Sequence, residues 1–306
     1  MLSEKVNNLR DNPLIRAALL QEQSLPSATL YIVGLPIGNA ADITLRAIWV
    51  LSACDTIACE DTRETRKLLD RYAIFTQCVS VHEHNECEGA EKLIERLRQG
   101  ERVALVTDAG TPAVSDPGSR VVQAVRSAGF RIVPVPGASA VVSAVSAAGL
   151  DAYRFTFAGF AESSGKAREE SVVRLCEKGE AFVLYEAPHR VRDLLKILGK
   201  TLEANRRVVV ARELTKRFET FCVLQAGELL AWSASHEPRG EYVVLVDERG
   251  SHDKERLDES VLRWARAIAT ELPISRTAAI AAKVSGVKRE TIYRTLLEEQ
   301  DCRRNE

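Results

Sequence analysis

The sequence predicts an α/β protein with two domains and a small helical tail. A chain of 306 residues is longer than one hydrophobic core usually fills, so two domains are expected. In the first half, short apolar segments alternate with amphipathic ones, a pattern typical of a doubly wound and mainly parallel sheet. In the second half, neighbouring strand segments follow one another after short links, which predicts a mixed sheet.

Residues 1–28 lack a strand or a strong amphipathic pattern, so we expect a flexible arm with one turn of helix near Pro13–Leu20. The first α/β domain is expected over residues 29–150. Its strands are expected at residues 30–33, 56–59, 78–81, 103–106 and 131–135. Its helices are expected after a cap at Asp42 or Thr44, and at residues 62–72, 89–99, 119–126 and 139–148.

The second α/β domain is expected over residues 151–248. Its strands are expected at residues 155–157, 181–185, 208–211, 220–224 and 241–246, and its helices at 166–177, 189–198 and 227–231. After a charged linker, residues 257–306 form the tail. Residues 275–286 and 287–294 predict two helices joined at Gly286, a helix-turn-helix-like pattern. The pattern alone leaves three interpretations open: DNA binding, a contact with RNA or the ribosome, and a purely structural hairpin.

Composition and cysteine usage indicate a cytoplasmic globular protein. Hydrophobic residues make up 45% of the chain and charged residues 28%. The seven cysteines are scattered without metal-ligand spacing, which predicts a reducing compartment and no metal site. No signal-peptide core is found near the first residue, and the longest run of apolar and small residues, Ala138–Leu150, is too short to cross a membrane. We therefore expect no membrane partner.

The charge is balanced overall but basic in two segments. The formal net charge is −1, yet residues 186–217 hold nine Lys or Arg against four Asp or Glu. Residues 276–304 hold seven against four. Such segments are either phosphate-binding surfaces or ordinary solvated helix faces, and composition leaves both interpretations open.

Several enzyme classes are excluded because their motifs are missing. The chain has no P-loop, no GxGxxG, no GxSxG and no pair of His residues at metal-binding helical spacing.

Polar or small residues follow five predicted strands of the first domain, at residues 34–39, 60–63, 82–86, 107–112 and 136–139. Each cluster alone suits helix capping. Together they predict a ligand crevice, because the carboxyl ends of parallel strands share one edge.

The order and spacing of these motifs resemble one known family. The matching segments are Pro36-Ile-Gly-Asn39, Glu60-Asp-Thr-Arg63, His84-Asn-Glu86, Asp108-Ala-Gly-Thr-Pro112, Asp116-Pro-Gly118, Pro136-Gly137, Tyr185-Glu186, His189-Arg190 and Ala211-Arg-Glu-Leu-Thr-Lys216. They closely resemble the bacterial ribosomal RNA small subunit methyltransferase I family of the tetrapyrrole-methylase-like superfamily. The resemblance covers about residues 29–300.

The resemblance implies a fold, an activity and a cofactor. It implies two α/β domains with S-adenosylmethionine in the cleft between them, and a homodimer. The implied activity is 2′-O-methylation of the ribose of a cytidine in 16S rRNA, within the small ribosomal subunit. Carried over by position, the cofactor contacts are Pro36, Gly38, Asn39, Asp108, Ala109, Gly110, Thr111, Ala138, Ser139, Gly159, Phe160, Tyr185 and Glu186.

Methyl transfer to a hydroxyl group also needs a proton acceptor. Asp61 is our first candidate, Glu60 the second and His84 the third; the alternative is that both carboxylates only cap the helix predicted at Thr62. Candidate RNA contacts are Arg63, His189, Arg190, Arg212, Lys216, Lys288, Arg289 and Arg294.

Two other functions compete with RNA methylation. One is methylation of a small molecule of the tetrapyrrole type, and the other is non-catalytic RNA binding by a protein that retains the cofactor cleft. The Glu60–Arg63 motif, the basic segment at residues 186–217 and the helical tail favour an RNA substrate. A buried macrocycle site would need none of these three features.

Overall fold

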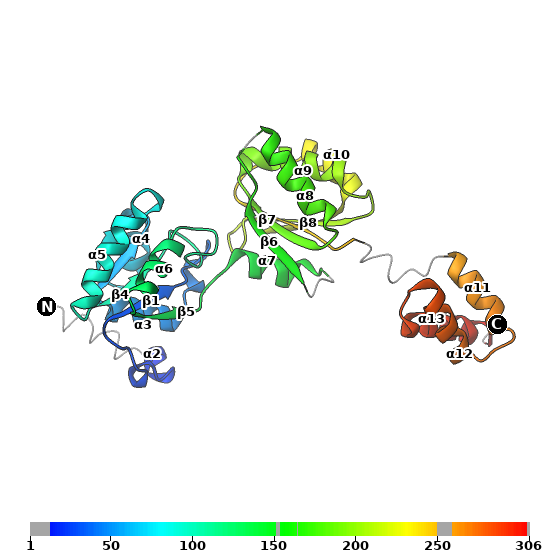
Figure 1. Ribbon diagram of the computed structural model, residues 1–306, viewed down its shortest axis with the longest axis horizontal. Helices are drawn as coiled ribbons and strands as arrows, with labels where there is room; N and C mark the ends of the chain where they lie inside the picture. Colours follow the sequence, from blue (N-terminus) through cyan, green and yellow to red (C-terminus); the bar gives the residue numbers. More distant parts are fainter. Residues whose placement is uncertain (1–12, 151–153, 164, 250–258, 305–306) are drawn as a thin grey trace.

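The computed structural model describes residues 13–150, 154–163, 165–249 and 259–304. Two five-stranded sheets form separate α/β domains, and three helices form the tail (Figure 1). The predicted fold class is therefore confirmed. Within the described residues, no helix has the length and apolar character that a membrane span requires.

The first sheet is entirely parallel, with strand order β3-β2-β4-β1-β5. Its strands are β1 (Thr29–Val33), β2 (Thr56–Cys59), β3 (Gln77–Ser80), β4 (Arg102–Leu105) and β5 (Arg131–Val135). Strand β2 is buried along its whole length, which explains its continuous apolar run.

Helices cover both faces of this sheet, as expected of a doubly wound domain. They are α3 (Leu45–Ala53), α4 (Thr62–Arg71), α5 (Glu86–Arg98) and α6 (Ser119–Ser127), with short 3-10 turns η2 (Ala40–Asp42) and η3 (Glu83–Asn85). Helices α3 and α4 pack on one face, and α5 and α6 pack on the other. Thr44, one of the two predicted caps, accepts the Ala47 amide proton at 3.0 Å and starts α3.

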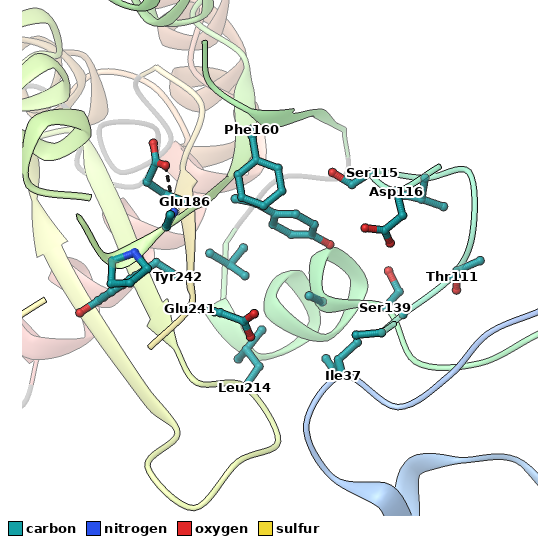
Figure 2. Close-up of a pocket in the computed structure, with 18 residues that line it drawn as sticks. Ile37, Thr111, Ser115, Asp116, Ser139, Phe160, Glu186, Leu214, Glu241 and Tyr242 are labelled. Atoms are coloured by element: carbon teal, nitrogen blue, oxygen red, sulfur yellow. Dashed lines mark hydrogen bonds between the residues drawn. The ribbon is translucent and has the colours of Figure 1, made fainter. Parts of the chain in front are cut away.

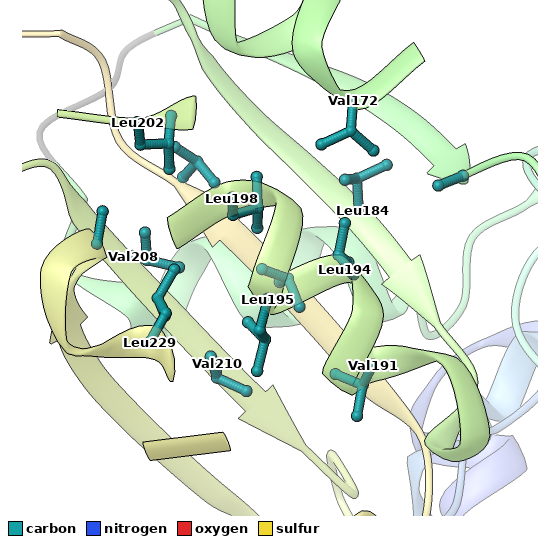
Figure 3. Close-up of a cluster of buried hydrophobic side chains, with 14 of the residues drawn as sticks. Val172, Leu184, Val191, Leu194, Leu195, Leu198, Leu202, Val208, Val210 and Leu229 are labelled. Carbon is teal, nitrogen blue, oxygen red and sulfur yellow. The ribbon is translucent and has the colours of Figure 1, made fainter. Parts of the chain in front are cut away.

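The second sheet is mixed, with order β6-β7-β10-β8-β9. Its strands are β6 (Phe155–Phe160), β7 (Ala181–Glu186), β8 (Arg207–Arg212), β9 (Thr220–Gln225) and β10 (Tyr242–Val246). The pair β6–β7 is parallel and the other three pairs are antiparallel. One face is covered by α8 (Gly165–Glu177), α9 (Pro188–Thr201), η4 (Ala226–Glu228) and α10 (Leu229–Ser235). Figure 3 shows the Leu residues of α9 against Val208 and Val210 of β8.

Helix α7 (Ala140–Ala148) covers the opposite face of the second sheet (Figure 1). The sequence analysis assigned this helix to the first domain, so the structure corrects that assignment. Val141, Ala144 and Ala148 pack against apolar side chains of β7, β8 and β10. The chain therefore crosses between the two sheets at residues 136–139, directly after β5.

The two ends of the chain add smaller helical elements. Helix α2 (Pro13–Ala17) and η1 (Leu20–Glu22) pack on α3, where Ile15 and Leu20 are buried with Trp49. This part of the expected flexible arm is thus held by apolar contacts, whereas residues 1–12 lie outside the described residues. The tail consists of α11 (Glu259–Ala269), α12 (Ile274–Ser285) and α13 (Arg289–Arg304). Gly286 ends α12 with a φ of 73°.

Candidate functional site

A cavity of about 350 Å³ lies between the two α/β domains. Loops at the carboxyl edge of the first sheet form one wall, and the ends of β6, β7 and β10 form the other (Figure 2). Predicted cofactor residues on these walls are Ala109, Gly110, Thr111, Ser139, Phe160, Tyr185 and Glu186. Lining residues that the sequence analysis missed include Ile37, Ser115, Asp116, Leu214, Glu241 and Tyr242.

Three loops of the first domain are held together by backbone contacts. The amide of Leu35 donates to the Gly110 carbonyl at 2.8 Å, and the amide of Gly110 donates to the Leu35 carbonyl at 3.1 Å. A Cβ atom added to Gly137 would lie 2.6 Å from the Gly34 carbonyl oxygen. The loops at residues 34–39, 107–112 and 136–139 therefore meet, as the strand-end clustering predicts.

Gly38 makes a contact between the domains and does not line the cavity. A Cβ atom on Gly38 would lie 2.5 Å from Cγ of Lys216, which belongs to the second domain. The Lys216 ammonium group pairs with Glu213 at 2.9 Å and with Glu241 at 2.7 Å. Lys216, a predicted RNA contact, is therefore engaged within the protein. Because Gly38 has no side chain, the Lys216 side chain can pass close to the first domain.

Other predicted cofactor residues that do not line the cavity are buried or make contacts within the protein. Pro36 is buried, and the Asn39 side chain accepts the Ala41 amide proton at 3.1 Å to start η2. The Ala138 carbonyl accepts from the Thr111 hydroxyl at 3.2 Å. Gly159 has a φ of 64° and faces Ser115, since an added Cβ would lie 3.6 Å from the Ser115 hydroxyl.

Aromatic side chains form an apolar wall of the cavity. The Tyr185 ring contacts Phe157 and Phe160, with centroid distances of 4.8 Å and 5.7 Å. Figure 2 shows the Phe160 ring at the cavity, where 53% of this residue is exposed. The Tyr185 hydroxyl accepts the Val141 amide proton at 2.8 Å, which fixes the first turn of α7. A flat apolar surface of this kind suits a nucleobase or an adenine ring.

Glu186 lines the cavity with its backbone, because its carboxylate is buried in ion pairs. The side chain is 0% exposed and forms ion pairs with Arg168 and with the Arg190 Nε atom, the latter at 3.1 Å. Arg190 also donates to the backbone carbonyls of Ala161 and Glu162. Glu186 and Arg190, predicted as cofactor and RNA contacts, thus hold the loop after β6. Arg168 was missed by the sequence analysis, since nothing near it in sequence marks its partner.

Asp61 caps α4, which is the alternative left open for it. Its carboxylate accepts the Arg63 amide proton at 2.7 Å and pairs with the Arg63 guanidinium at 2.9 Å. The Arg63 side chain lowers the pKa of Asp61 to about 2. A carboxylate with such a pKa is a weak proton acceptor. Asp61 also does not line the cavity. These contacts favour the capping role of Asp61, and its role as proton acceptor stays a prediction.

Glu60, Asp108 and Asp116 form a group of neighbouring carboxylates. Burial raises the pKa of Glu60, and the charges of Asp108 and Asp116 raise it further. Asp108 accepts the Asp61 amide proton at 3.1 Å and does not line the cavity. His84 is exposed on η3, 6.0 Å from the ring of His82, and is not part of the cavity wall either.

Glu86 anchors the loop that carries Asp116. Its buried carboxylate accepts amide protons from Gly118 at 2.9 Å, Arg120 at 3.0 Å and Val121 at 3.4 Å. These amides belong to the first turn of α6, where negative charge is favourable. The sequence analysis included Glu86 in a motif but assigned it no role.

The remaining candidate RNA contacts differ in their surroundings. Arg212 donates to the Arg239 carbonyl at 2.7 Å, so its guanidinium is partly engaged. Arg63 and His189 are exposed in the first turns of α4 and α9. Lys288, Arg289 and Arg294 are exposed on the tail, which Figure 1 shows apart from the two α/β domains. Among the described residues, no group of three metal-ligating side chains forms a metal site.

Comparisons with known proteins cover nearly the whole chain. Residues 29–230 match the model of the Tetrapyrrole (Corrin/Porphyrin) Methylases, and residues 255–300 match the RsmI C-terminal HTH domain. The ribosomal RNA small subunit methyltransferase I of Escherichia coli O157:H7 is 43% identical over 273 residues, covering 89% of this chain and 95% of that protein. The protein of the same name from Pseudomonas aeruginosa is 40% identical over 279 residues, covering 90% and 99%.

Solved structures with low identity share the fold. Diphthine synthase superposes with a TM-score of 0.58 at 17% identity, covering 72% of this chain and 90% of its own. The cobalamin biosynthetic enzyme cobalt precorrin-4 methyltransferase superposes with a TM-score of 0.56 at 19% identity, covering 72% and 95%. Together with the matches along both α/β domains and the tail, these findings place the protein in a family. The chain belongs to the ribosomal RNA small subunit methyltransferase I family, within the tetrapyrrole methylases.

Proposed function

We propose that the protein transfers a methyl group from S-adenosylmethionine to the ribose 2′-oxygen of a cytidine in 16S rRNA of the small ribosomal subunit. The observation that carries this proposal is similarity over about nine tenths of the chain. Relatives named for small-subunit rRNA methylation match 89–90% of the chain at 40–43% identity. The tail match supports an RNA substrate, because it adds a helix-turn-helix element outside the methylase domains.

The cavity residues fit the chemical groups of S-adenosylmethionine. A volume of about 350 Å³ is in the range for a ligand of this size. Phe160 and Tyr185 suit the adenine ring, and the hydroxyls of Thr111 and Ser139 suit polar groups. The cofactor supplies a methyl group on a positively charged sulfur. The protein's own part is to hold the ribose oxygen in line with that methyl group and to take up its proton.

RNA contacts are proposed for the predicted basic residues whose side chains reach solvent. These are Arg63, His189, Lys288, Arg289 and Arg294. Of these residues, Arg63 lies near the cluster formed by Glu60, Asp108 and Asp116 in the first domain. The tail residues lie apart from the two α/β domains and would bind a more distant region of the rRNA (Figure 1). Arginine and lysine side chains at such positions contribute sequence-independent phosphate binding.

We also propose that the protein acts as a homodimer in the bacterial cytoplasm, where small ribosomal subunits are assembled. Exposed apolar side chains on the second domain, Val142, Phe155 and Val223, support self-association. Six cysteines are free thiols, namely Cys54, Cys59, Cys78, Cys87, Cys176 and Cys222, which is consistent with a reducing compartment. Gel filtration with light scattering measures the oligomeric state directly.

The proposal is tested by methyl transfer to 30S subunits from cells that lack the modification. Purified protein is incubated with labelled S-adenosylmethionine, and the rRNA is digested to nucleosides. We expect label in 2′-O-methylcytidine, approaching one methyl group per subunit. Protein-free 16S rRNA and 50S subunits serve as comparison substrates. Label on a base, label only on a tetrapyrrole, or no transfer to 30S subunits would contradict the proposed function.

A further inference from the structure

Asp116 places a carboxylate on the wall of the interdomain cavity. The residue lies between β4 and α6, in the loop that also contributes Thr111 and Ser115. In the view of Figure 2, the Asp116 carboxylate and the Ser139 hydroxyl point into the cavity from the wall formed by the first domain. Phe160 and Glu241 lie on the wall formed by the second domain. The carboxylate is therefore placed to meet a group held between the domains.

The other two carboxylates that line the cavity are engaged in ion pairs. Three acidic residues line the cavity within the described part of the chain, namely Asp116, Glu186 and Glu241. Glu186 is buried against two arginines, and Glu241 pairs with Lys216 at 2.7 Å. Asp116 has no Lys, Arg or His partner within 4.0 Å among the described residues. Among the three lining carboxylates, Asp116 is thus the one without a cationic partner to stabilise its ionised form.

The surroundings of Asp116 favour proton uptake. Asp116 is exposed at the cavity wall, but partial desolvation by the surrounding protein raises its pKa, and the charge of Asp108 raises it further, against a hydrogen bond with Thr107 that lowers it. The groups that interact with Asp116 electrostatically are Asp108, Glu60 and the Tyr185 phenol. A carboxylate with a raised pKa is a stronger base than an ordinary one.

The loop that carries Asp116 is fixed at its far end. Glu86 accepts three amide protons from the first turn of α6, beginning with Gly118, two residues after Asp116. Gly118 has a φ of 130°, and a Cβ there would lie 3.3 Å from a Leu105 methyl group. A fixed loop holds the carboxylate in one position, which is what a proton acceptor in a transfer reaction needs.

We propose that the Asp116 carboxylate accepts the proton of the ribose 2′-hydroxyl during methyl transfer; this rests on the function proposed above. The 2′-oxygen forms a bond to the methyl carbon as the carbon–sulfur bond breaks. The electron pair of that bond stays on sulfur, which becomes neutral. The hydroxyl proton moves to an Asp116 oxygen, and the carboxyl group later releases it to water. Charge and atoms balance without any further reactant.

The test compares wild type with Asp116→Asn, which keeps the shape of the side chain but removes its basicity. Single-turnover methylation of 30S subunits should slow by roughly 10²-fold or more. The wild-type rate should rise about tenfold per pH unit below the pKa of Asp116 and then level off, because the ionised form is the active one. This rise should be lost in Asp116→Asn and retained, with a shifted midpoint, in Asp116→Glu.

Binding affinities and the titration of the carboxyl group provide readouts that do not depend on methyl transfer. Calorimetric affinity for S-adenosylmethionine and filter-binding affinity for 30S subunits should stay within about threefold of wild type in Asp116→Asn. Carbon-13 NMR of aspartate-labelled protein should show one carboxyl resonance, absent from Asp116→Asn, that titrates above the ordinary value of about 3.9. Asp193→Asn, which changes an exposed carboxylate on α9, is the matched control and should keep the wild-type rate and pH profile.

The outcomes separate this inference from the proposed function. If wild type methylates 30S subunits and Asp116→Asn does so at the same rate and with the same pH profile, the assignment of Asp116 is overturned. It is also overturned if the variant loses cofactor affinity in proportion to its rate, since Asp116 would then be a binding residue. If wild type itself transfers no methyl group to 30S subunits, the proposed function fails, and the role of Asp116 fails with it.

Discussion

The buried Glu86 carboxylate fixes the end of the loop that carries Asp116. Its carboxylate lies at the start of α5 and binds three amides at the start of α6. Those amides have no partner within their own helix, so the carboxylate satisfies them and complements the helix dipole. The same contact joins two helices that cover one face of the first sheet. Glu86 therefore acts on the cavity through the position of the Asp116 loop.

Replacing Glu86 with Ala should lower the free energy of unfolding by about 2 kcal/mol, because buried amides lose their acceptor. Urea unfolding followed by fluorescence measures this change. Glu88→Ala is the matched control on the same helix, since Glu88 is exposed and pairs with Lys92 at 2.6 Å. Its expected cost is below about 0.5 kcal/mol. Equal losses in the two variants would refute an anchoring role for Glu86.

Asp61 and Glu186 show what sequence motifs leave undetermined at the level of single residues. The sequence places Asp61 after β2 and Glu186 at the end of β7, because strand ends and helix starts can be located from local patterns. The ion-pair partner of each carboxylate depends on which cation the folded chain brings close. Arg63 is two residues from Asp61, but Arg168 reaches Glu186 from α8 across the loop after β6. Side-chain pairing of this second kind has no local sequence signal.

At the level of elements, the crossing between the domains depends on two glycines in contact. The chain leaves β5 and passes directly over the end of β1, where Gly137 meets Gly34. A Cβ on Gly137 would lie 2.6 Å from a backbone oxygen and 2.7 Å from a backbone carbon of Gly34. Backbone atoms cannot rotate away as a side chain can. This contact therefore sets how closely the first turn of α7 approaches the first sheet.

Gly137→Ala should consequently destabilise the protein by about 3 kcal/mol, since the crossing must move away from β1. Thermal and urea unfolding measure this loss, and affinity for S-adenosylmethionine should fall with it. The comparison is Gly199→Ala within α9, where the nearest atom to the added Cβ is 3.4 Å away. That variant should be unchanged or stabilised by up to about 1 kcal/mol, as Ala favours helix. A Gly137→Ala protein as stable as wild type would show that the crossing is not tightly packed.

The elements themselves were largely predictable, but their partners were not. The buried strands of the first sheet appear in the sequence as short apolar runs, and the β–α alternation gives their parallel arrangement. Helix α7 has a small apolar face that fits either sheet. Its partners in β7, β8 and β10 follow far along the chain. Periodicity identifies the apolar face of a helix and carries no information about the sheet that it covers.

At the level of the whole molecule, the protein joins a two-domain cavity to a separate helical tail. The domains meet at Gly38 and Lys216 and at Gly159 and Ser115, on either side of the cavity. The tail has its own small core, which includes Ala265, Ala278, Ile292 and Leu296. A separate core and exposed cations are the properties expected of a substrate-binding module rather than of a part of the catalytic site.

Deleting residues 257–306 should therefore leave the affinity for S-adenosylmethionine unchanged and weaken binding to 30S subunits. The salt dependence of 30S binding should also flatten, because Lys288, Arg289 and Arg294 would no longer displace counterions. Replacing these three residues with Ala in the full chain should flatten the slope of log affinity against log salt by about 2. Lys166→Ala on α8 is the control, with a side chain that is 90% exposed.

Filter binding over a range of salt concentrations measures both quantities. An unchanged slope in the truncated protein would assign the tail a structural role. Loss of cofactor binding on truncation would indicate instead that the tail supports the α/β domains. Both results would contradict the proposed division of the molecule into a catalytic part and an RNA-binding part.

The position of β10 at the centre of the second sheet has a consequence for the protein during its synthesis. All strands of the first sheet have been made once residue 135 leaves the ribosome, so that sheet can form early. Helix α7 follows at once, but β10 is completed only at Val246, about 100 residues and about 5–20 s later. Throughout that interval the apolar face of α7 has no complete sheet to cover. The nascent chain therefore presents a target for chaperones, and the second wall of the cavity is built last.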